Sequence, residues 1–325
     1  MKKILLSTTM LALFAGAASA EVTLSGSGRF GLDYAENRDA EVQLAYRLRI
    51  NVDAKFEADN GVTYGGRIRF QNTNSTQVVD VSDGAAVIRN AAEFSPAYLY
   101  VEASGVRVEV GNSNTAIDSV ALMYNPEIGF QESSFGDPEG NFYSFSSGPY
   151  GANRVGIYAA YSYSGVNLKA SYIQADQTVD TGVNGSGADE LSVAADFTTG
   201  QFTVAAAYAD NGAGIEGNYV TFVGAAYAFS DVGNVGLNYN DNGEYGAWGK
   251  TITLYGNYTI NGITLAGYVS DSDEEYIDED GDLQDNDTAY GIGASYDLGG
   301  ATLAGAIQSS FQGEMVGDLG VRMSF

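Results

Sequence analysis

The 325-residue chain contains no cysteine and no histidine, and only four of its residues are proline. Without cysteine the fold has no disulfides, so backbone hydrogen bonds and burial must hold it together. Without histidine the chain lacks the commonest metal ligand and the usual general base, which argues against an enzyme. The low proline content, together with 42 glycines, suits a chain made of strands and turns.

Basic residues are also scarce. Lys and Arg number 15 against 41 Asp and Glu, which gives a formal net charge of −26. A surface that binds nucleic acid needs an excess of positive charge, so this balance excludes a nucleic-acid partner. The same acidity predicts a mild preference for cations in any channel that the chain forms, because charge around a pore mouth attracts counter-ions.

The only long apolar run, residues 4–17, lies at the N-terminus. Lys2 and Lys3 precede it and an Ala-Ser-Ala tripeptide follows it, which is the pattern of a cleavable signal peptide. The run is shorter than the roughly 20 apolar residues that a membrane-spanning helix needs. We therefore predict a signal peptide over residues 1–20 and one secreted domain over residues 21–325.

Apolar and polar residues of the mature chain alternate with a period of two. From Val42 to Phe56 every even position is apolar, whereas the odd positions carry residues such as Asn51 and Lys55. This predicts a half-buried strand well beyond the usual length of about 5–6 residues. The pattern recurs between seven short and eight long connections, which gives sixteen strands. Short turns on one side and long loops on the other are typical of outer-membrane barrels, so we predict an all-β, antiparallel transmembrane β-barrel.

Aromatic residues cluster near the ends of the predicted strands, as expected where a barrel meets the two membrane interfaces. The predicted girdle beside the short turns consists of Phe56, Tyr163, Phe197, Phe202, Phe229, Tyr258 and Tyr296. The predicted girdle beside the long loops consists of Tyr34, Phe70, Tyr172, Tyr208, Tyr239, Trp248, Tyr268, Tyr290 and Phe311. Residues 91–103 and 217–229 are apolar on both faces, which we interpret as burial against a neighbouring subunit.

The C-terminal strand is apolar at alternate positions and ends in Phe325. It resembles the terminal signature of outer-membrane barrels, which implies that Phe325 serves as an assembly signal. With the signal peptide, the opening sequence of residues 21–26 and the strand count, the whole mature chain resembles the trimeric sixteen-stranded general porins, most closely the Rhodobacter type. The resemblance implies a homotrimer in the outer membrane of a Gram-negative bacterium, surrounded by lipid and lipopolysaccharide. It also implies passive diffusion of small hydrophilic solutes and ions.

The longest connection, residues 112–152, combines apolar side chains with acids. The resemblance implies that this third long loop folds into the lumen and narrows it. Strand alternation places five arginines on the lumen face, namely Arg29, Arg47, Arg49, Arg67 and Arg69. In the family's arrangement, the loop acids that face them are Asp118, Glu127, Glu132, Asp137 and Glu139. We predict a charged constriction between the two sets. The plainer alternative is that the arginines only pair with lumen acids such as Asp33, Asp53 and Glu57.

Three alternatives to general diffusion remain open from the residues alone. A substrate-specific outer-membrane channel would need a track of lumen aromatics, for which Tyr158 is a candidate. An outer-membrane enzyme is disfavoured by the lack of histidine, and a soluble adhesin would bury its apolar faces in a core. Among cofactors, only a structural Ca²⁺ is suggested, by Asp278, Asp280 and Asp282 in the acidic outer loop. Their spacing is a poor match to a calcium loop, because Gly281 is misplaced.

Overall fold

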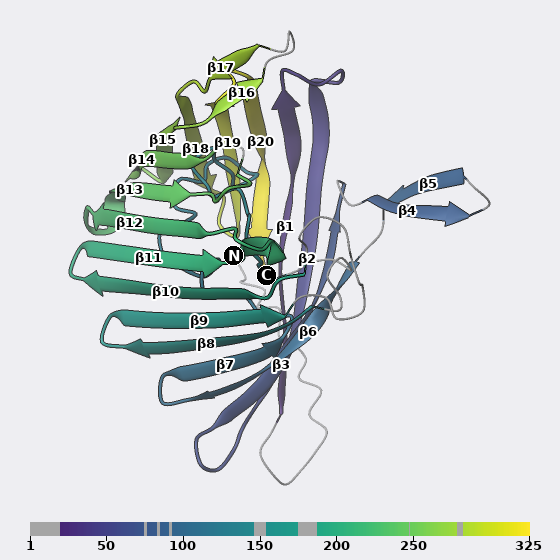
Figure 1. Ribbon diagram of the computed structural model, residues 1–325, viewed down its shortest axis with the longest axis vertical. Helices are drawn as coiled ribbons and strands as arrows, with labels where there is room; N and C mark the ends of the chain where they lie inside the picture. The colour runs from purple at the N-terminus through teal and green to yellow at the C-terminus, as the bar shows by residue number, and fades with distance from the viewer. Residues whose placement is uncertain are drawn as a thin grey trace, which may run out of the picture.

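The computed structural model describes residues 20–74, 77–82, 85–90, 93–145, 154–174, 187–246, 248–277 and 282–325. Sixteen long strands lie in these ranges: β1 (Glu21–Ala35), β2 (Val42–Glu57), β3 (Thr63–Thr73), β6 (Glu93–Ala103), β7 (Val106–Gly111), β8 (Val155–Tyr163), β9 (Val166–Gln174), β10 (Glu190–Thr199), β11 (Phe202–Asp210), β12 (Val220–Ala228), β13 (Gly233–Asp241), β14 (Lys250–Ile260), β15 (Ile263–Ser272), β18 (Ala289–Asp297), β19 (Ala301–Ser309) and β20 (Met315–Ser324). All are antiparallel, and they close into one barrel because β20 pairs with β1 (Figure 1). The predicted sixteen-stranded barrel is confirmed. The predicted signal peptide lies outside the described residues, apart from Ala20.

Two of the long connections contain small β-hairpins. One consists of β4 (Gln77–Ser82) and β5 (Ala85–Asn90) and projects away from the barrel (Figure 1). The other consists of β16 (Glu275–Ile277) and β17 (Leu283–Asp285). Single 3-10 turns occur at η1 (Gly212–Gly214) and η2 (Ser230–Val232). The described ranges contain no helix with the length and apolar character needed to cross a bilayer.

The barrel exposes apolar side chains and buries polar ones. Leu44 is 78 % exposed and Ile292 is 71 % exposed, whereas Asn238, Thr253 and Ser270 are fully buried. A water-soluble protein has the opposite arrangement. Because barrel closure pairs the backbone groups between strands, this apolar surface can face lipid without exposing a sheet edge.

All seven predicted members of the aromatic girdle beside the short turns are exposed, as that prediction requires. The girdle beside the long loops needs correction. Tyr268 and Phe311 are buried, with exposures of 3 % and 1 %. Tyr268 points into the lumen and donates its hydroxyl to Gln308, while Phe311 packs against Trp248 and Phe135. The prediction relied on closeness to a loop and did not apply the strand alternation at Tyr268.

Residues 112–145, which we call the constriction loop, fold into the lumen. Ile117 and Met123 of this loop are fully buried and pack in one cluster with Ala207 of β11 and Phe222 of β12. The second apolar face of residues 217–229 is therefore covered by the constriction loop, at least at Phe222. A loop distant in sequence, and not a neighbouring subunit, covers the inner face at Phe222, and a subunit contact on the outer face stays a prediction.

Polar side chains of the barrel wall bind the backbone of the constriction loop. Ser171 and Ser192 accept hydrogen bonds from the Ala116 amide at 2.9 and 3.2 Å. Asn238 donates to the Leu122 carbonyl at 2.8 Å. Asp318 accepts from the Phe130 amide at 2.8 Å and from the Gln131 amide at 3.3 Å. Buried backbone groups need such partners, so these bonds fix the loop at well-separated points of the wall.

Gly320 of β20 lies under the constriction loop at the seam of the barrel. A methyl group added there would meet the Phe30 carbonyl and would lie 2.8 Å from Cγ of the Phe130 ring. We predict that Gly320→Ala destabilises the folded barrel by about 1–3 kcal/mol, as overpacking typically does. The midpoint of heat-induced loss of the compact electrophoretic form measures this change. Gly28→Ala at the same seam is the control, since its added methyl meets Met323 at 3.5 Å and the Arg47 carbonyl at 3.8 Å, which are ordinary contact distances. Equal stability of the two variants would contradict the prediction.

Candidate pore constriction

The five predicted arginines lie on the inner face of three neighbouring strands. Arg29 of β1 stands opposite Arg47 of β2 in the strand register. Arg29 donates to the Gln131 carbonyl of the constriction loop, and Arg49 donates to Gln71 at 2.8 Å. Like charges this close repel one another, so they need compensating charge nearby.

The other two arginines lie on β3 and bind neighbours on β2. Arg67 binds Asp53 through two hydrogen bonds of 2.7 and 3.2 Å, and Arg69 donates to Asn51 at 2.8 Å. The alternative that the arginines pair with lumen acids therefore holds for Arg67 and Asp53. Asp33 instead pairs with Arg38, which is not one of the five predicted arginines. Pairing with Asp53 holds the Arg67 side chain in place and leaves its position on the lumen wall unchanged.

Arg322 of β20 is a sixth member of this surface that the sequence analysis missed. It stands opposite Arg29 in the register across the barrel seam. Its alternation with Val321 and Met323 was visible in the sequence, but only barrel closure brings β20 beside β1. We call these six residues the arginine wall.

Glu132 is the loop acid that meets the arginine wall. Its carboxylate lies 2.7 Å from Arg322 and 3.8 Å from both Arg29 and Arg47. A tight turn presents it, closed by backbone hydrogen bonds of 3.1 and 3.3 Å between Ile128 and Ser133. Glu132 has a φ of 54°, in the left-handed region that side chains other than glycine avoid. The turn therefore holds Glu132 in a strained backbone conformation that is directed at the wall.

The other predicted loop acids do not form ion pairs with the arginine wall among the described residues. Asp118 accepts a hydrogen bond from the Tyr124 hydroxyl at 2.7 Å. Asp137 accepts from the amide and the hydroxyl of Ser134, at 3.0 and 2.9 Å. The structure thus brings Glu132 alone into contact and gives Asp118 and Asp137 bonds within the loop.

Glu139 belongs to a junction at the far side of the constriction loop. Its carboxylate accepts from the Trp248 amide at 3.0 Å, and its own amide donates to Asn242 at 3.1 Å. Phe135 packs edge-on against Trp248 at the same junction, with ring centroids 5.9 Å apart. Glu139 therefore fastens the loop to the connection that follows β13.

Burial changes the acidity of the loop carboxyl groups. It raises the pKa of Glu127 to about 8, and the neighbouring carboxylates of Asp137 and Glu132 act in the same direction. Burial also raises the pKa of Asp137 to about 7, against the opposing effect of its hydrogen bonds from Ser134. Arg29 opposes the shift at Glu127 without reversing it. Glu127 is thus mostly protonated at pH 7 and becomes charged in mildly alkaline solution.

The remaining predicted residues lie away from the constriction. Phe325 closes the seam, where its amide donates to the Gly26 carbonyl at 3.0 Å and its carbonyl accepts from the Gly26 amide at 2.7 Å. Of the suggested calcium ligands, Asp278 and Asp280 lie outside the described residues. Within the described ranges, no group of three or more acids is placed to hold a metal ion.

Known proteins with the same architecture were identified by sequence and structure comparison. The sequence profile of the Gram-negative porins matches residues 7–311. A porin of Fuscovulum blasticum is 44 % identical over 314 residues, covering 94 % of this chain and all of that protein. A porin of Rhodobacter capsulatus is 26 % identical over 330 residues, with the same coverage. A solved structure of a Rhodopseudomonas blastica porin triple mutant superposes with a TM-score of 0.80 at 40 % identity, covering 94 % of this chain and all of that one.

The closed sixteen-stranded barrel, its lipid-facing apolar surface and the match to relatives along almost the whole chain agree with one another. The chain belongs to the Gram-negative porin family and is a porin of the outer membrane.

Proposed function

We propose that this porin is a general-diffusion channel, not an enzyme, and that it passes small hydrophilic solutes and ions with a weak preference for cations. The observation that carries the proposal is the meeting of Glu132 with Arg29, Arg47 and Arg322 inside a closed barrel. Opposite charges on two sides of a narrow passage produce a transverse field. Such a field orients water and polar solutes and disfavours apolar ones, so charge at the narrowing sets selectivity.

The weak cation preference is supported by charge outside the constriction. Exposed acids on the long connections include Glu36, Asp39, Glu41, Asp273, Glu274 and Asp285. They raise the local concentration of cations at the mouth, whereas the arginine wall favours anions at the narrowest part. Because the two effects oppose each other, the net preference is expected to be small.

Planar-bilayer conductance of the refolded mature chain tests the proposal directly. We expect large ohmic steps in groups of three and a small cation-selective reversal potential in a salt gradient. A folded barrel that gives no steps would contradict the channel function, and a strongly anion-selective potential would contradict the proposed preference.

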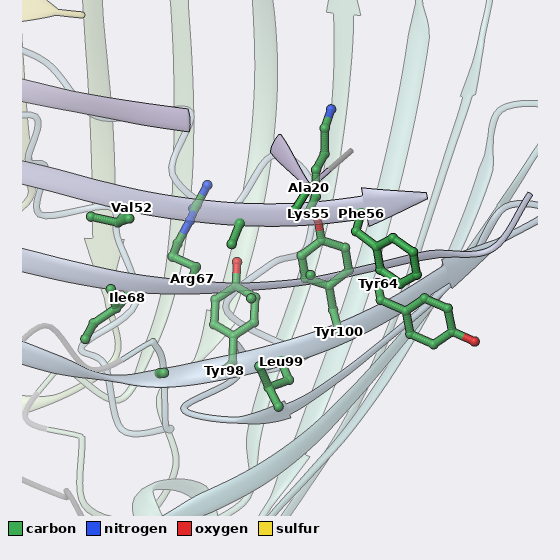
Figure 2. Close-up of a pocket in the computed structure, with 14 residues that line it drawn as sticks. Ala20, Val52, Lys55, Phe56, Tyr64, Arg67, Ile68, Tyr98, Leu99 and Tyr100 are labelled. Atoms are coloured by element: carbon green, nitrogen blue, oxygen red, sulfur yellow. The ribbon is translucent and has the colours of Figure 1, made fainter. Parts of the chain in front are cut away.

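A homotrimer is the assembly that we propose, and a groove on the outer wall supports it. The groove has a volume of about 660 Å³ and lies over β2, β3 and β6. Figure 2 shows Val52, Phe56, Tyr64, Ile68 and Leu99 around it. Small residues, namely Ala54, Gly66 and Ala97, also line the groove and leave room for side chains of a second copy. The rest of the apolar surface would face lipid and lipopolysaccharide.

A charge placed in this groove tests the trimer. Leu99 is 68 % exposed in the isolated chain, so Leu99→Arg is expected to release monomers in native electrophoresis because the arginine would be desolvated at the interface. The matched control is Leu254→Arg on β14, where leucine is 53 % exposed. In the control the arginine is desolvated by lipid at a similar cost in free energy, and the variant should remain trimeric. Dissociation of both variants alike, or a monomeric parent protein, would contradict the prediction.

Removal of the Glu132 charge tests the transverse field. We predict that Glu132→Gln moves the reversal potential towards chloride by several millivolts in a tenfold KCl gradient, because the arginine wall loses its nearest counter-charge. Asp39→Asn, in an exposed outer loop, removes the same formal charge and should shift the potential much less. An equal shift in the two variants would assign the effect to overall charge.

Selectivity is also expected to depend on pH through Glu127. Its pKa is raised to about 8, so the carboxyl is neutral at pH 6 and negative at pH 9. Raising the pH therefore adds negative charge to the constriction and should increase cation preference, with a component near pH 8 from Glu127 beside the component of Asp137, whose pKa is about 7. In Glu127→Gln the component near pH 8 should disappear from reversal potentials measured across the same range. Parent and variant curves that coincide would rule out Glu127 as the titrating group.

A further inference from the structure

A recess opens in the inner wall beside the constriction loop. It has a volume of about 310 Å³, at the lower end of the range of ligand pockets. Strands β3, β6, β7 and β8 form one side, and the constriction loop forms the other. The lining consists of Arg67, Arg69, Tyr98, Arg107, Glu109, Asn114, Ser119, Phe145, Tyr158 and Ala160. Three guanidinium groups thus face this space together with a single lining carboxylate.

The guanidinium groups are held in fixed positions. Arg107 donates to Glu109 at 2.7 Å and to Glu102 at 3.0 Å, and it lies 3.7 Å from the centroid of the Tyr100 ring. Arg69 lies 4.4 Å above the Phe145 ring. Stacked and paired guanidinium groups lose little further freedom when they bind a carboxylate, and their planar geometry suits two parallel hydrogen bonds.

Aromatic rings supply the apolar part of the recess. Tyr98 and Tyr158 face the lumen with exposures of only 7 % and 8 %, which agrees with the orientation expected for Tyr158. Tyr98 meets Phe145 edge-on, with ring centroids 5.9 Å apart. The Ser119 hydroxyl donates to the Tyr158 hydroxyl at 3.3 Å. Because Arg69 and Tyr98 each cover part of Phe145, another planar ring would pack edge-on or offset against the ring surfaces that they leave open.

We infer that this recess is a weak binding subsite for small planar aromatic monocarboxylates on their way through the pore. The carboxylate would bind the guanidinium groups of Arg67 and Arg69, and the ring would pack against Tyr98 and Phe145. The inference rests on the proposed function, since solutes must reach the lumen. It narrows that function by naming a class of solute that is held longer than others.

Size and charge favour this class. A volume of about 310 Å³ admits one substituted ring and excludes most of a disaccharide. A neutral ring would lack the charge-assisted contact with the guanidinium groups, and a small carboxylate without a ring would lack the contact with the aromatic rings. A cation would have to compete with Arg107 for Glu109, the one carboxylate in the lining.

Benzoate is the probe, and block of potassium chloride current through the refolded trimer at 0.1 M salt is the first readout. We expect saturable block by benzoate at millimolar concentrations. Acetate and benzyl alcohol, which each lack one half of the ligand, should block at least about tenfold more weakly, as loss of one charge-assisted contact implies. Block by all three compounds at equal concentrations would overturn the inference.

Variants locate the subsite. Arg69→Gln and Tyr98→Leu should each weaken benzoate block by about tenfold. Arg38→Gln removes an equal charge outside the recess and the arginine wall, where Arg38 pairs with Asp33, and Tyr161→Leu removes a tyrosine that is 42 % exposed on the outer face. Both controls should retain the block. Unchanged block in Arg69→Gln and Tyr98→Leu would overturn the inference.

The two proposals can fail separately. Normal steps without benzoate block would overturn the subsite and leave the general-diffusion channel intact. Absence of steps would overturn the channel, and the subsite would then be decided by saturation-transfer NMR of benzoate with the folded protein in detergent. Transfer that is lost in both Arg69→Gln and Tyr98→Leu would support the subsite, and transfer that is equal in the parent and both variants would reject it.

Discussion

The need to satisfy the backbone of a loop buried inside a barrel is the constraint on which the rest of this structure depends. Residues 112–145 lack long strands or helices, so they cannot pair all their backbone groups among themselves. The wall supplies partners of both kinds: Asp318 accepts from loop amides and Asn238 donates to a loop carbonyl. This explains why the lumen carries buried polar residues where neither water nor solute binding requires them. It also fixes the position of Glu132, two residues beyond the Phe130 amide.

The packing of the constriction loop also decides where the charged side chains of the lumen lie. Arg29 and Arg322 stand side by side across the barrel seam, and their mutual repulsion is tolerated because Glu132 lies between them and the rest of the lumen. The strained backbone of Glu132 is consistent with a position determined by its surroundings. Asp137 and Glu139, although equally acidic in the sequence, are used to hold the loop. The acids of one segment therefore differ in role according to which surface each one reaches.

Apolar contacts also hold the constriction loop to the barrel wall, on both sides of the lumen. Phe222 and Met123 bury one side of the loop against β11 and β12, and Phe130 packs near the seam glycines on the opposite wall. The loop spans the lumen between these contacts, which leaves the arginine wall on one side of the passage. The recess beside Tyr98 arises where the constriction loop and strands β6 to β8 do not close completely on each other. A constriction and a recess are thus two consequences of how one loop is packed.

The sequence by itself determined the barrel, because an alternation with period two, sustained between short and long connections, is compatible with few other folds. It also determined that the five predicted arginines face the lumen, since side-chain direction in a strand follows from position. Only the tertiary structure decided the partners. Arg322 joins Arg29 through closure of the first and last strands, and Glu132 alone among five loop acids meets the wall. The residue that covers Phe222 was hidden for the same reason, since it belongs to a loop far away in the chain, whereas the inward direction of Tyr268 was available from strand alternation. Periodicity is a local property that a sequence displays directly, whereas contacts across the lumen depend on how an irregular loop is folded, and no local pattern encodes that.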